Sequence, residues 1–254
     1  MAYKVSKIPY EGEIAVETTA IFRKLAVTHR YLAELKGTAL SIPNQGILID
    51  TLSVQESKDS SEIENIITTH DDLFQDDAKQ LIEESLPPAI KEVRNYVKAL
   101  KRGFSLISER GLLTSREIVQ IQELLEANKA GFRKLPGTEL KNARTGEIVY
   151  TPPQNYDEIV DLMSNLEKFI NDESLMDYDP LIKMAIMHFQ FESIHPFYDG
   201  NGRTGRIMNI LYLVNKGLLD IPVLYLSRYF IVTKTAYSHR LPGVRARGAW
   251  EAWI

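Results

Sequence analysis

A short stretch in the second half of the chain brings together residue types that can do chemistry. Residues 195–206 read His-Pro-Phe-Tyr-Asp-Gly-Asn-Gly-Arg-Thr-Gly-Arg. His195 can take a proton from a hydroxyl group, because an imidazole titrates near neutral pH. Arg203 and Arg206 are three residues apart and therefore share one face of a helix, where their guanidinium groups match phosphate oxygens. These residue types and spacings predict a site that grips a polyphosphate.

The glycines and the acidic residue of this stretch support the same interpretation. Glycine permits positive φ, so successive backbone N–H groups from Gly200 onward can converge on an anion. The N-terminus of the helix that follows adds partial positive charge. Asp199 would repel phosphate unless a divalent cation lay between them, and Mg²⁺ held by one carboxylate and phosphate oxygens meets that need.

Glycine-rich loops also occur in unrelated nucleotide sites and in plain turns, and these fit the chain less well. Gly200-x-Gly202-x-x-Gly205, with Asp220 downstream, matches the dinucleotide-binding fingerprint, but that fingerprint needs a strand ahead of it, and the preceding segment is helical in character. The chain has no His-Arg-Asp, Asp-Phe-Gly or Gly-Lys-Ser/Thr, which argues against kinase and P-loop sites. A plain turn between two helices would not account for the accompanying histidine, acid and arginines.

Composition sets limits on the class of protein. The chain has 254 residues, of which 44% are apolar and 25% charged, and its net charge is −4. These values are typical of a soluble globular protein and predict no attraction to nucleic acid or to an anionic membrane. The absence of cysteine excludes disulfides and thiolate metal sites, and agrees with a cytoplasmic location. No signal peptide or membrane-spanning run is predicted.

The apolar spacing predicts an all-α fold with a single β-hairpin. Helices are predicted over residues 13–35, 45–56, 58–67, 89–102, 115–128, 155–171, 181–193 and 206–215. Asp179 and Pro180 should begin the helix over 181–193, which is apolar nearly all round and should therefore be the central buried helix. Glycine, proline and β-prone residues over 137–153 predict the hairpin, with a turn near Arg144–Gly146.

Residues 195–206 resemble the signature of Fic-domain proteins, His-x-Phe-x-Asp/Glu-Gly-Asn-Gly-Arg-x-x-Arg, at every specified position. The hairpin over 137–153 is similar to the flap of that family, and Leu224-Tyr-Leu-Ser-Arg-Tyr also looks like the family. The resemblance implies a Fic catalytic core over 96–240 and an N-terminal helical region over 1–95. We expect the remaining segment, 241–254, to be truncated or packed on a further region.

The resemblance implies Mg²⁺-dependent transfer of AMP from ATP to a Ser, Thr or Tyr hydroxyl of a protein. It makes His195 the general base and Asp199 the Mg²⁺ ligand, and Phe197 becomes a core anchor. The nucleotide-binding residues that it implies are Gly200, Asn201, Gly202, Arg203, Thr204, Gly205, Arg206 and Tyr237. Arg206 would reach the γ-phosphate, and Tyr237 would lie near the adenine. Thr233 stands where the family often has Asn, so contacts to the base can differ.

A second pattern lies far upstream of the first. Residues 60–65, Ser-Ser-Glu-Ile-Glu-Asn, fit Ser/Thr-x-x-x-Glu-Gly/Asn. On its own this pattern is typical of a capped, solvated helix, but beside an intact Fic motif it resembles the inhibitory helix of the class whose inhibitor is N-terminal. Glu64 is then expected to form a bidentate pair with Arg206 in the space that ATP needs, and Ser60, one turn earlier, to steady Glu64.

The sequence leaves other functions open besides AMP transfer. Within the family, the chain could instead remove AMP from a modified protein, or transfer another phosphate-containing group such as UMP, phosphocholine or phosphate. Outside enzymes, the alternative is a non-catalytic helical interaction module. The expected partners are ATP and a protein substrate, with the chain itself among the candidates, and a homodimer stays open. Neither nucleic acid nor a membrane is an expected partner.

Overall fold

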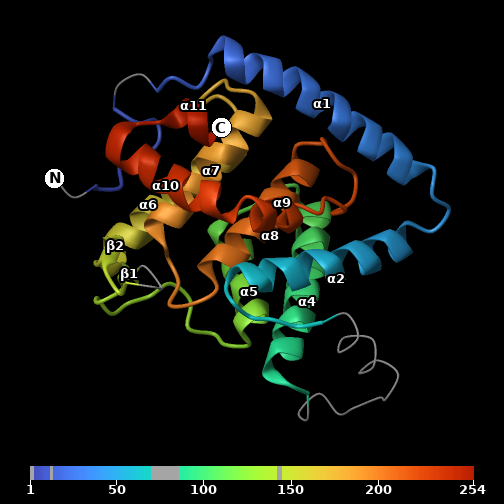
Figure 1. The fold of residues 1–254 in the computed structure, drawn as a ribbon, viewed down its shortest axis with the longest axis horizontal. Coiled ribbons are helices and arrows are strands. Elements are labelled where there is room, and N and C mark those ends of the chain that lie inside the picture. Colours follow the sequence, from blue (N-terminus) through green and yellow to red (C-terminus); the bar gives the residue numbers. More distant parts are fainter. Residues whose placement is uncertain (1–2, 12–13, 70–85, 142–144) are drawn as a thin grey trace.

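The computed structural model describes residues 3–11, 14–69, 86–141 and 145–254. The fold is helical with one β-hairpin, as the sequence predicts (Figure 1). The helices are α1 (Thr19–Leu40), α2 (Gln45–Ile63), α4 (Pro88–Arg110), α5 (Ser115–Glu126), α6 (Tyr156–Asn171), α7 (Pro180–Ile194), α8 (Asn201–Asn215), α9 (Ser227–Val232), α10 (Lys234–Arg247) and α11 (Trp250–Trp253). The strands are β1 (Leu140–Lys141) and β2 (Ile148–Tyr150).

Helix α7 lies at the centre of the fold, as its composition predicts. The Asp179 side chain accepts from the N–H of Leu181, and Pro180 takes the first helical position, so the predicted start is confirmed. Nearly every side chain of α7 is buried, and the helix packs against α6 and α8. The residues that bear the chemistry therefore follow directly from a fixed element of the core.

Several helix boundaries differ from the prediction. Residues 45–63 form the single helix α2 instead of two helices over 45–56 and 58–67. Helix α1 begins at Thr19, where the Thr18 side chain caps it, and not near residue 13. Helix α8 begins at Asn201 and not at Arg206. Both arginines of the motif consequently lie within the first two turns of α8.

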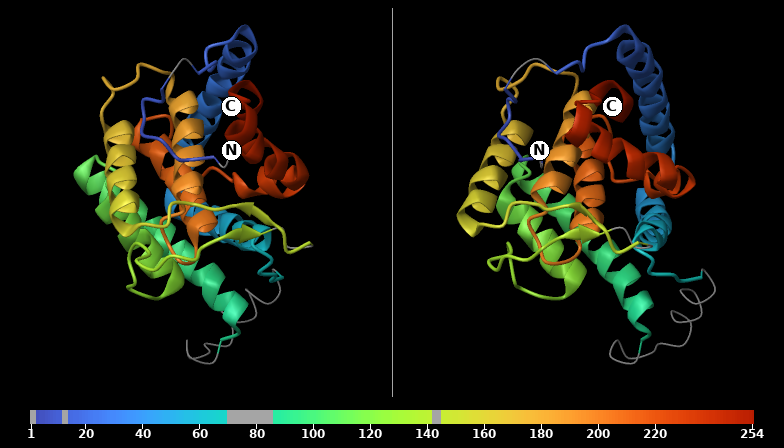
Figure 2. Two further views of the ribbon diagram at one scale, coloured as in Figure 1. Left: turned by 90° about the vertical axis from the view of Figure 1, so that its left-hand side faces the viewer. Right: turned by 60° about the vertical axis from the view of Figure 1, so that its left-hand side comes forward.

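The hairpin lies across the loop that joins α7 to α8 (Figure 2). Strands β1 and β2 pair antiparallel, with Leu140 opposite Tyr150 and an irregularity beside Lys141. The predicted turn near Arg144–Gly146 lies partly outside the described residues, although Gly146 has the positive φ of 72° that such a turn needs. The hairpin thus covers the motif loop as a flap would.

The C-terminal helices pack on the core, and their tryptophans are not left exposed. Trp250 is 6% exposed and contacts Phe189, and Trp253 stacks on His188 and donates from Nε1 to the carbonyl of Ala185. The end of the chain is therefore packed against α7. The predicted boundary between residues 95 and 96 falls inside α4, and the division into regions stays a prediction. Among the described residues, none of the helices has the length and apolar content needed to cross a membrane.

Candidate active site

His195 directly follows α7 and has an unusual backbone conformation. It caps the helix with φ 49° and ψ 60°, in the left-handed region, and its N–H donates to the carbonyl of Phe191. Left-handed φ is uncommon for a residue with a Cβ, and it persists only where the surroundings enforce it. Pro196 follows and disfavours continuation of the helix. The conformation turns the chain sharply out of α7 at the candidate base.

A buried arginine that the sequence analysis did not single out holds this turn. Arg133 is fully buried, and its side chain donates to the carbonyl oxygens of His195 (2.8 Å), Ile194 (3.4 Å) and Pro153. Its own N–H donates to the carbonyl of Pro196 at 2.8 Å. One guanidinium group therefore ties the candidate base to the segment that follows the hairpin.

The hairpin is also fixed to the end of α7. Tyr150 donates from its hydroxyl to the carbonyl of Ser193 at 2.7 Å. The guanidinium carbon of Arg245 lies 3.6 Å from the centre of the Tyr150 ring, and Arg245 donates to the carbonyl of Glu192 at 3.1 Å. A cation over an aromatic face and a buried hydrogen bond together stabilise this contact. The hairpin and the residues before the motif thus form one unit.

Burial keeps the imidazole of His195 neutral. Desolvation, and next the positive charges of Arg133 and Arg245, lower the pKa of His195 to about 4. The negative charges of Glu64 and Asp199 instead raise the pKa of His195, so both carboxylates lie within electrostatic reach of its imidazole. A neutral imidazole beside an anion-binding loop can accept a proton from a hydroxyl group.

The loop after His195 is fastened by the side chain of Asn201. Its Oδ1 accepts from the N–H of Phe197 and its Nδ2 donates to the carbonyl of Phe197, both at 2.9 Å. Phe197 is fully buried, which confirms its predicted role as a core anchor. The side chain of Thr204 is also buried, so in this structure Asn201 and Thr204 direct their side chains to the protein and not to a ligand.

The N-terminus of α8 is not capped by a side chain, as an anion site there would require. Gly200 caps the helix with φ 76°, and no side chain caps the first amides. A Cβ at Gly202 would collide with Oε1 of Glu64, so glycine is needed for a carboxylate or phosphate to approach the backbone here. Gly205 instead packs against α7, where a Cβ would lie 2.9 Å from Oε1 of Glu192.

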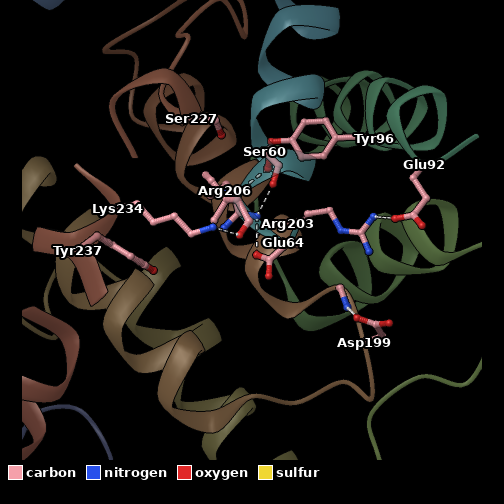
Figure 3. Close-up of polar contacts among 12 residues, drawn as sticks. Ser60, Glu64, Glu92, Tyr96, Asp199, Arg203, Arg206, Ser227, Lys234 and Tyr237 are labelled. Carbon is pink, nitrogen blue, oxygen red and sulfur yellow. Dashed lines mark hydrogen bonds and ion pairs between the residues drawn. The ribbon is translucent and has the colours of Figure 1, made fainter. Parts of the chain in front are cut away.

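Arg206 is buried and paired with the end of α2 (Figure 3). Its Nη2 donates to Oε1 of Glu64 at 2.8 Å, its Nε donates to Oγ of Ser60 at 2.7 Å, and its Nη2 also donates to the Ser60 carbonyl at 3.0 Å. The expected bidentate pair is therefore wrong, because Ser60 occupies the second edge of the guanidinium group. Ser60 steadies Arg206 and not Glu64.

The Glu64–Arg206 pair is asymmetric in its exposure. The side chain of Arg206 is 4% exposed and that of Glu64 is 41% exposed. Partial burial pushes the pKa of Glu64 upward, but the charge of Arg206 and its hydrogen bond outweigh this, and the pKa of Glu64 lies below its ordinary value. Glu64 is thus ionised near neutral pH, and it has a route into water if an anion takes its place.

Arg203 lies beside Arg206 and also forms ion pairs with carboxylates. Its Nη2 donates to Oε1 of Glu126 at 2.8 Å, and its Nη1 donates to Glu92 (Figure 3). Neither glutamate could be predicted from the sequence, because they lie on α4 and α5 and no local pattern connects them to the motif. Both guanidinium groups of the loop are therefore engaged by glutamates from other elements.

Tyr237 comes close to the site from α10. Its hydroxyl bonds to Nε2 of His188 at 3.0 Å, and its ring packs edge-on against Phe230 with centroids 4.9 Å apart. His188 is a buried core histidine, as predicted, and burial followed by the charge of Arg206 lowers its pKa to about 3. Tyr237 lies within electrostatic reach of Arg206 and Glu64. It can therefore border a ligand held at the loop.

A cavity of about 500 Å³ has Tyr237 in its wall. It is lined by α1, α7, α8, α9, α10 and α11, with His188, Asn209 and Trp253 among its walls. None of the residues 195–206 lines it. The residues that the sequence predicts to bind phosphate therefore lie outside this cavity.

Asp199 offers one carboxylate for a cation. Its Oδ1 accepts from the N–H of Gly200 at 2.7 Å, and the residue is exposed. Within the described part of the chain, no group of three or more His, Cys, Asp or Glu residues is arranged to hold a metal ion. Mg²⁺ commonly takes one or two carboxylates and completes its shell with water and phosphate. Asp199 fits that mode and would need a phosphate ligand beside it.

Comparison with protein families gives two adjoining matches. Residues 22–105 match the model described as Fic/DOC family N-terminal, and residues 112–213 match the Fic/DOC family. The first match contains α2 and most of α1 and α4, and the second contains the hairpin and the motif.

Curated relatives carry a common name. The chain is 28% identical over 191 residues to "Probable protein adenylyltransferase" of Aquifex aeolicus, covering 74% of this chain and 56% of that protein. It is 24% identical over 158 residues to a protein adenylyltransferase of Caenorhabditis elegans, covering 60% of this chain and 31% of that protein. The chain thus matches about half of the first relative and less of the second.

Solved structures share the fold. A Fic family protein from Desulfovibrio desulfuricans G20 aligns with a TM-score of 0.74 and 22% identity, over 98% of this chain and 72% of the other. A fragment of Fic-1 from Caenorhabditis elegans aligns with a TM-score of 0.63 and 17% identity, over 93% of this chain and 71% of the other. At these identities the likeness supports the fold.

Proposed function

This chain belongs to the Fic/DOC family, and from that premise we propose that it transfers AMP from ATP to a hydroxyl group of a protein and is inhibited by its own Glu64. One observation carries the proposal. The neutral imidazole of His195 opens the loop that leads into the N-terminus of α8, and the two buried arginines of this helix start are engaged by carboxylates. Adenylyltransferase names among the relatives support the same reaction class.

The residues of the loop would divide the work as follows. His195 takes the proton from a Ser, Thr or Tyr hydroxyl group of the protein substrate. The hydroxyl oxygen forms a bond to the α-phosphorus of ATP while the bond from that phosphorus to pyrophosphate breaks. The amides after Gly200 hold phosphate oxygens, and Arg203 and Arg206 neutralise the phosphates. Asp199 would hold Mg²⁺, which neutralises charge on the departing pyrophosphate. Tyr237 would border the adenosine.

Glu64 would inhibit by competing with the γ-phosphate for Arg206. Its carboxylate lies against Gly202 and holds Arg206, so a γ-phosphate at that guanidinium group would meet a negative charge. ATP would then bind in a pose that does not align the α-phosphorus with the hydroxyl group. Because Glu64 is 41% exposed, water screens the pair and the inhibition should be partial.

The hairpin offers a place for the protein substrate. Ile148 and Val149 of β2 are 54% and 53% exposed although they are apolar. An extended segment can add to such a strand through backbone hydrogen bonds, which would present a hydroxyl group to His195. This mode reads the backbone and therefore admits Ser, Thr or Tyr.

Glu64→Gly should increase transfer of label from α-labelled ATP to protein by about tenfold, since it frees Arg206 for the γ-phosphate. Glu62→Gln, two residues earlier at the end of α2, removes a charge that pairs with Lys58 and serves as the matched control. The measurement is protein-bound label, together with the intact mass of the chain after incubation with ATP and Mg²⁺.

The position of the label separates the outcomes. Label from the α-position alone indicates AMP transfer, and label from γ-labelled ATP would indicate transfer of phosphate. Equal labelling of the wild type and Glu64→Gly would remove Glu64 as an inhibitor. If neither position labels any protein in either variant, the chain does not catalyse transfer.

The pH dependence should show a base with a lowered pKa. A histidine with a depressed pKa keeps its proton-accepting form until the pH falls close to that value, here about 4. We therefore expect kcat/KM of Glu64→Gly to stay level as the pH falls from about 8 to about 5.5, whereas a solvated histidine would lose half its activity near about 6.5. An acidic limb centred near that higher value would show that the imidazole is not desolvated in the free enzyme.

A further inference from the structure

Two glycines at the start of α8 each face a glutamate from another part of the chain. A Cβ at Gly202 would collide with Oε1 of Glu64, and a Cβ at Gly200 would collide with Oε1 of Glu126. These are positions where a phosphate oxygen would meet the loop. Two carboxylates therefore lie against the backbone that is proposed to bind phosphate.

The two glutamates also hold the two arginines in parallel. Glu64 accepts from Arg206 at 2.8 Å, and Glu126 accepts from Arg203 at the same distance. Each side chain thus makes the two contacts expected of a bound phosphate oxygen: one with a guanidinium group and one with a glycine. Glu126 is the last residue of α5 and Glu64 follows the last residue of α2, so the contacts arise from independent elements.

We propose that Glu126 is a second glutamate that occupies the phosphate site, filling the subsite formed by Gly200 and Arg203 as Glu64 fills the subsite formed by Gly202 and Arg206. The inference rests on the proposed function, because it takes the ligand to be the polyphosphate of a nucleotide. If Glu64 alone is removed, Glu126 still occupies the other half of the phosphate site.

The surroundings of Glu126 make it an effective occupant. Its side chain is 13% exposed, against 41% for Glu64, so less water screens its charge. Burial raises its pKa; Arg203 opposes this, while the charges of Asp199, Glu92 and Glu64 add to it. Three further carboxylates thus lie within electrostatic reach of Glu126 around a site for an anion. An incoming phosphate must displace Glu126 from Arg203 and Glu64 from Arg206.

Glu92 has a different role in the same cluster. It engages Nη1 of Arg203, whereas the atoms nearest a Cβ at Gly200 and Gly202 belong to other side chains. Nε of Arg203 is buried and has no hydrogen-bond partner among the described residues. Arg203 therefore retains a donor for a phosphate while Glu92 holds it in place, and only Glu126 must leave.

The test measures binding of Mg²⁺–ATP by calorimetry to the wild type, Glu64→Gly, Glu126→Gln and the double variant. Glu123→Gln, one turn earlier on α5, removes the same charge from the same helix and is the matched control. We expect Glu126→Gln to tighten binding by about tenfold in the Glu64→Gly background, and Glu123→Gln to leave it unchanged. Inorganic pyrophosphate should show the same gain, and adenosine should show none.

The outcomes are distinct. If Glu64→Gly binds ATP but Glu126→Gln adds nothing or weakens binding, Glu126 is not an occupant of the phosphate site and the inference is wrong. The same holds if adenosine gains as much as ATP. If neither the single variants nor the double variant binds ATP or pyrophosphate, the proposed function itself fails. Glu126→Asp keeps the charge but withdraws it by one methylene, so it should tighten ATP binding by less than Glu126→Gln does. It replaces Glu126→Gln if that variant does not fold.

Discussion

His195→Ala in the Glu64→Gly background should lower AMP transfer by about a thousandfold while leaving ATP binding close to that of the parent, because a general base contributes to the transition state and little to the ground state. The imidazole is neutral in the free protein and lies beside the phosphate loop. Its loss removes the proton acceptor but none of the groups proposed to hold phosphate. The measurement is initial rate against ATP concentration, which separates kcat from KM.

The control uses a histidine outside the site. His239 is exposed on α10, so His239→Ala in the same background should transfer AMP as the parent does. A His195→Ala variant that retains its rate would show that another group accepts the proton. A fall in kcat that is matched by loss of ATP binding would instead assign His195 to the structure of the loop.

The motif could be found from sequence because its members are contiguous. His195, Asp199, Arg203 and Arg206 lie within twelve positions, and a chain that turns from one helix into another must bring them together. The fold class followed from apolar spacing for a similar reason. Helices α6 and α7 each have a local cap, Asn155 and Asp179, so their starts were set by neighbouring residues.

Helix α2 shows where apolar spacing fails. Its buried face after Val54 is polar, because Glu56 accepts from the N–H and hydroxyl of Ser227 and from the hydroxyl of Tyr96. A polar face looks like a solvated one in the sequence, so the helix was divided at the point where apolar residues end. The same face then carries Ser60 to Arg206, so the missed part of the helix is the part that reaches the site.

Helix α8 and the outer partners show two further limits. Glycine has a low intrinsic helix propensity, so the sequence predicts the start of α8 at Arg206. In the structure Gly202 and Gly205 lie within α8, and glycine is required at both because neighbouring side chains leave no room for a Cβ. Arg133 and Glu126 act on residues that are 62 and 77 positions away, respectively. No local spacing links such pairs, and only the packed structure does.

Arg133→Lys in the Glu64→Gly background should lower kcat for AMP transfer by about a hundredfold with a smaller change in KM for ATP, since a displacement of the base by about 1 Å has an effect of that size. Arg133 donates to the carbonyls of His195, Ile194 and Pro153, and a lysine ammonium group on a flexible stem cannot hold all three in the geometry of a planar fork. His195 would then relax from its left-handed conformation and move its imidazole away from the hydroxyl group.

Lysine keeps the buried positive charge of Arg133, so the variant tests whether Arg133 acts by holding His195 in place. If the charge of Arg133 acted mainly by lowering the pKa of His195, Arg133→Lys would keep both the rate and the pH profile of the parent. If Arg133 served stability alone, the variant would lower the melting temperature with kcat unchanged at temperatures where it is folded. Lys134→Arg, at the exposed next position, is the matched control and should change neither quantity. A lower kcat in a folded protein with intact ATP binding is the result that identifies Arg133 as the residue that positions the base.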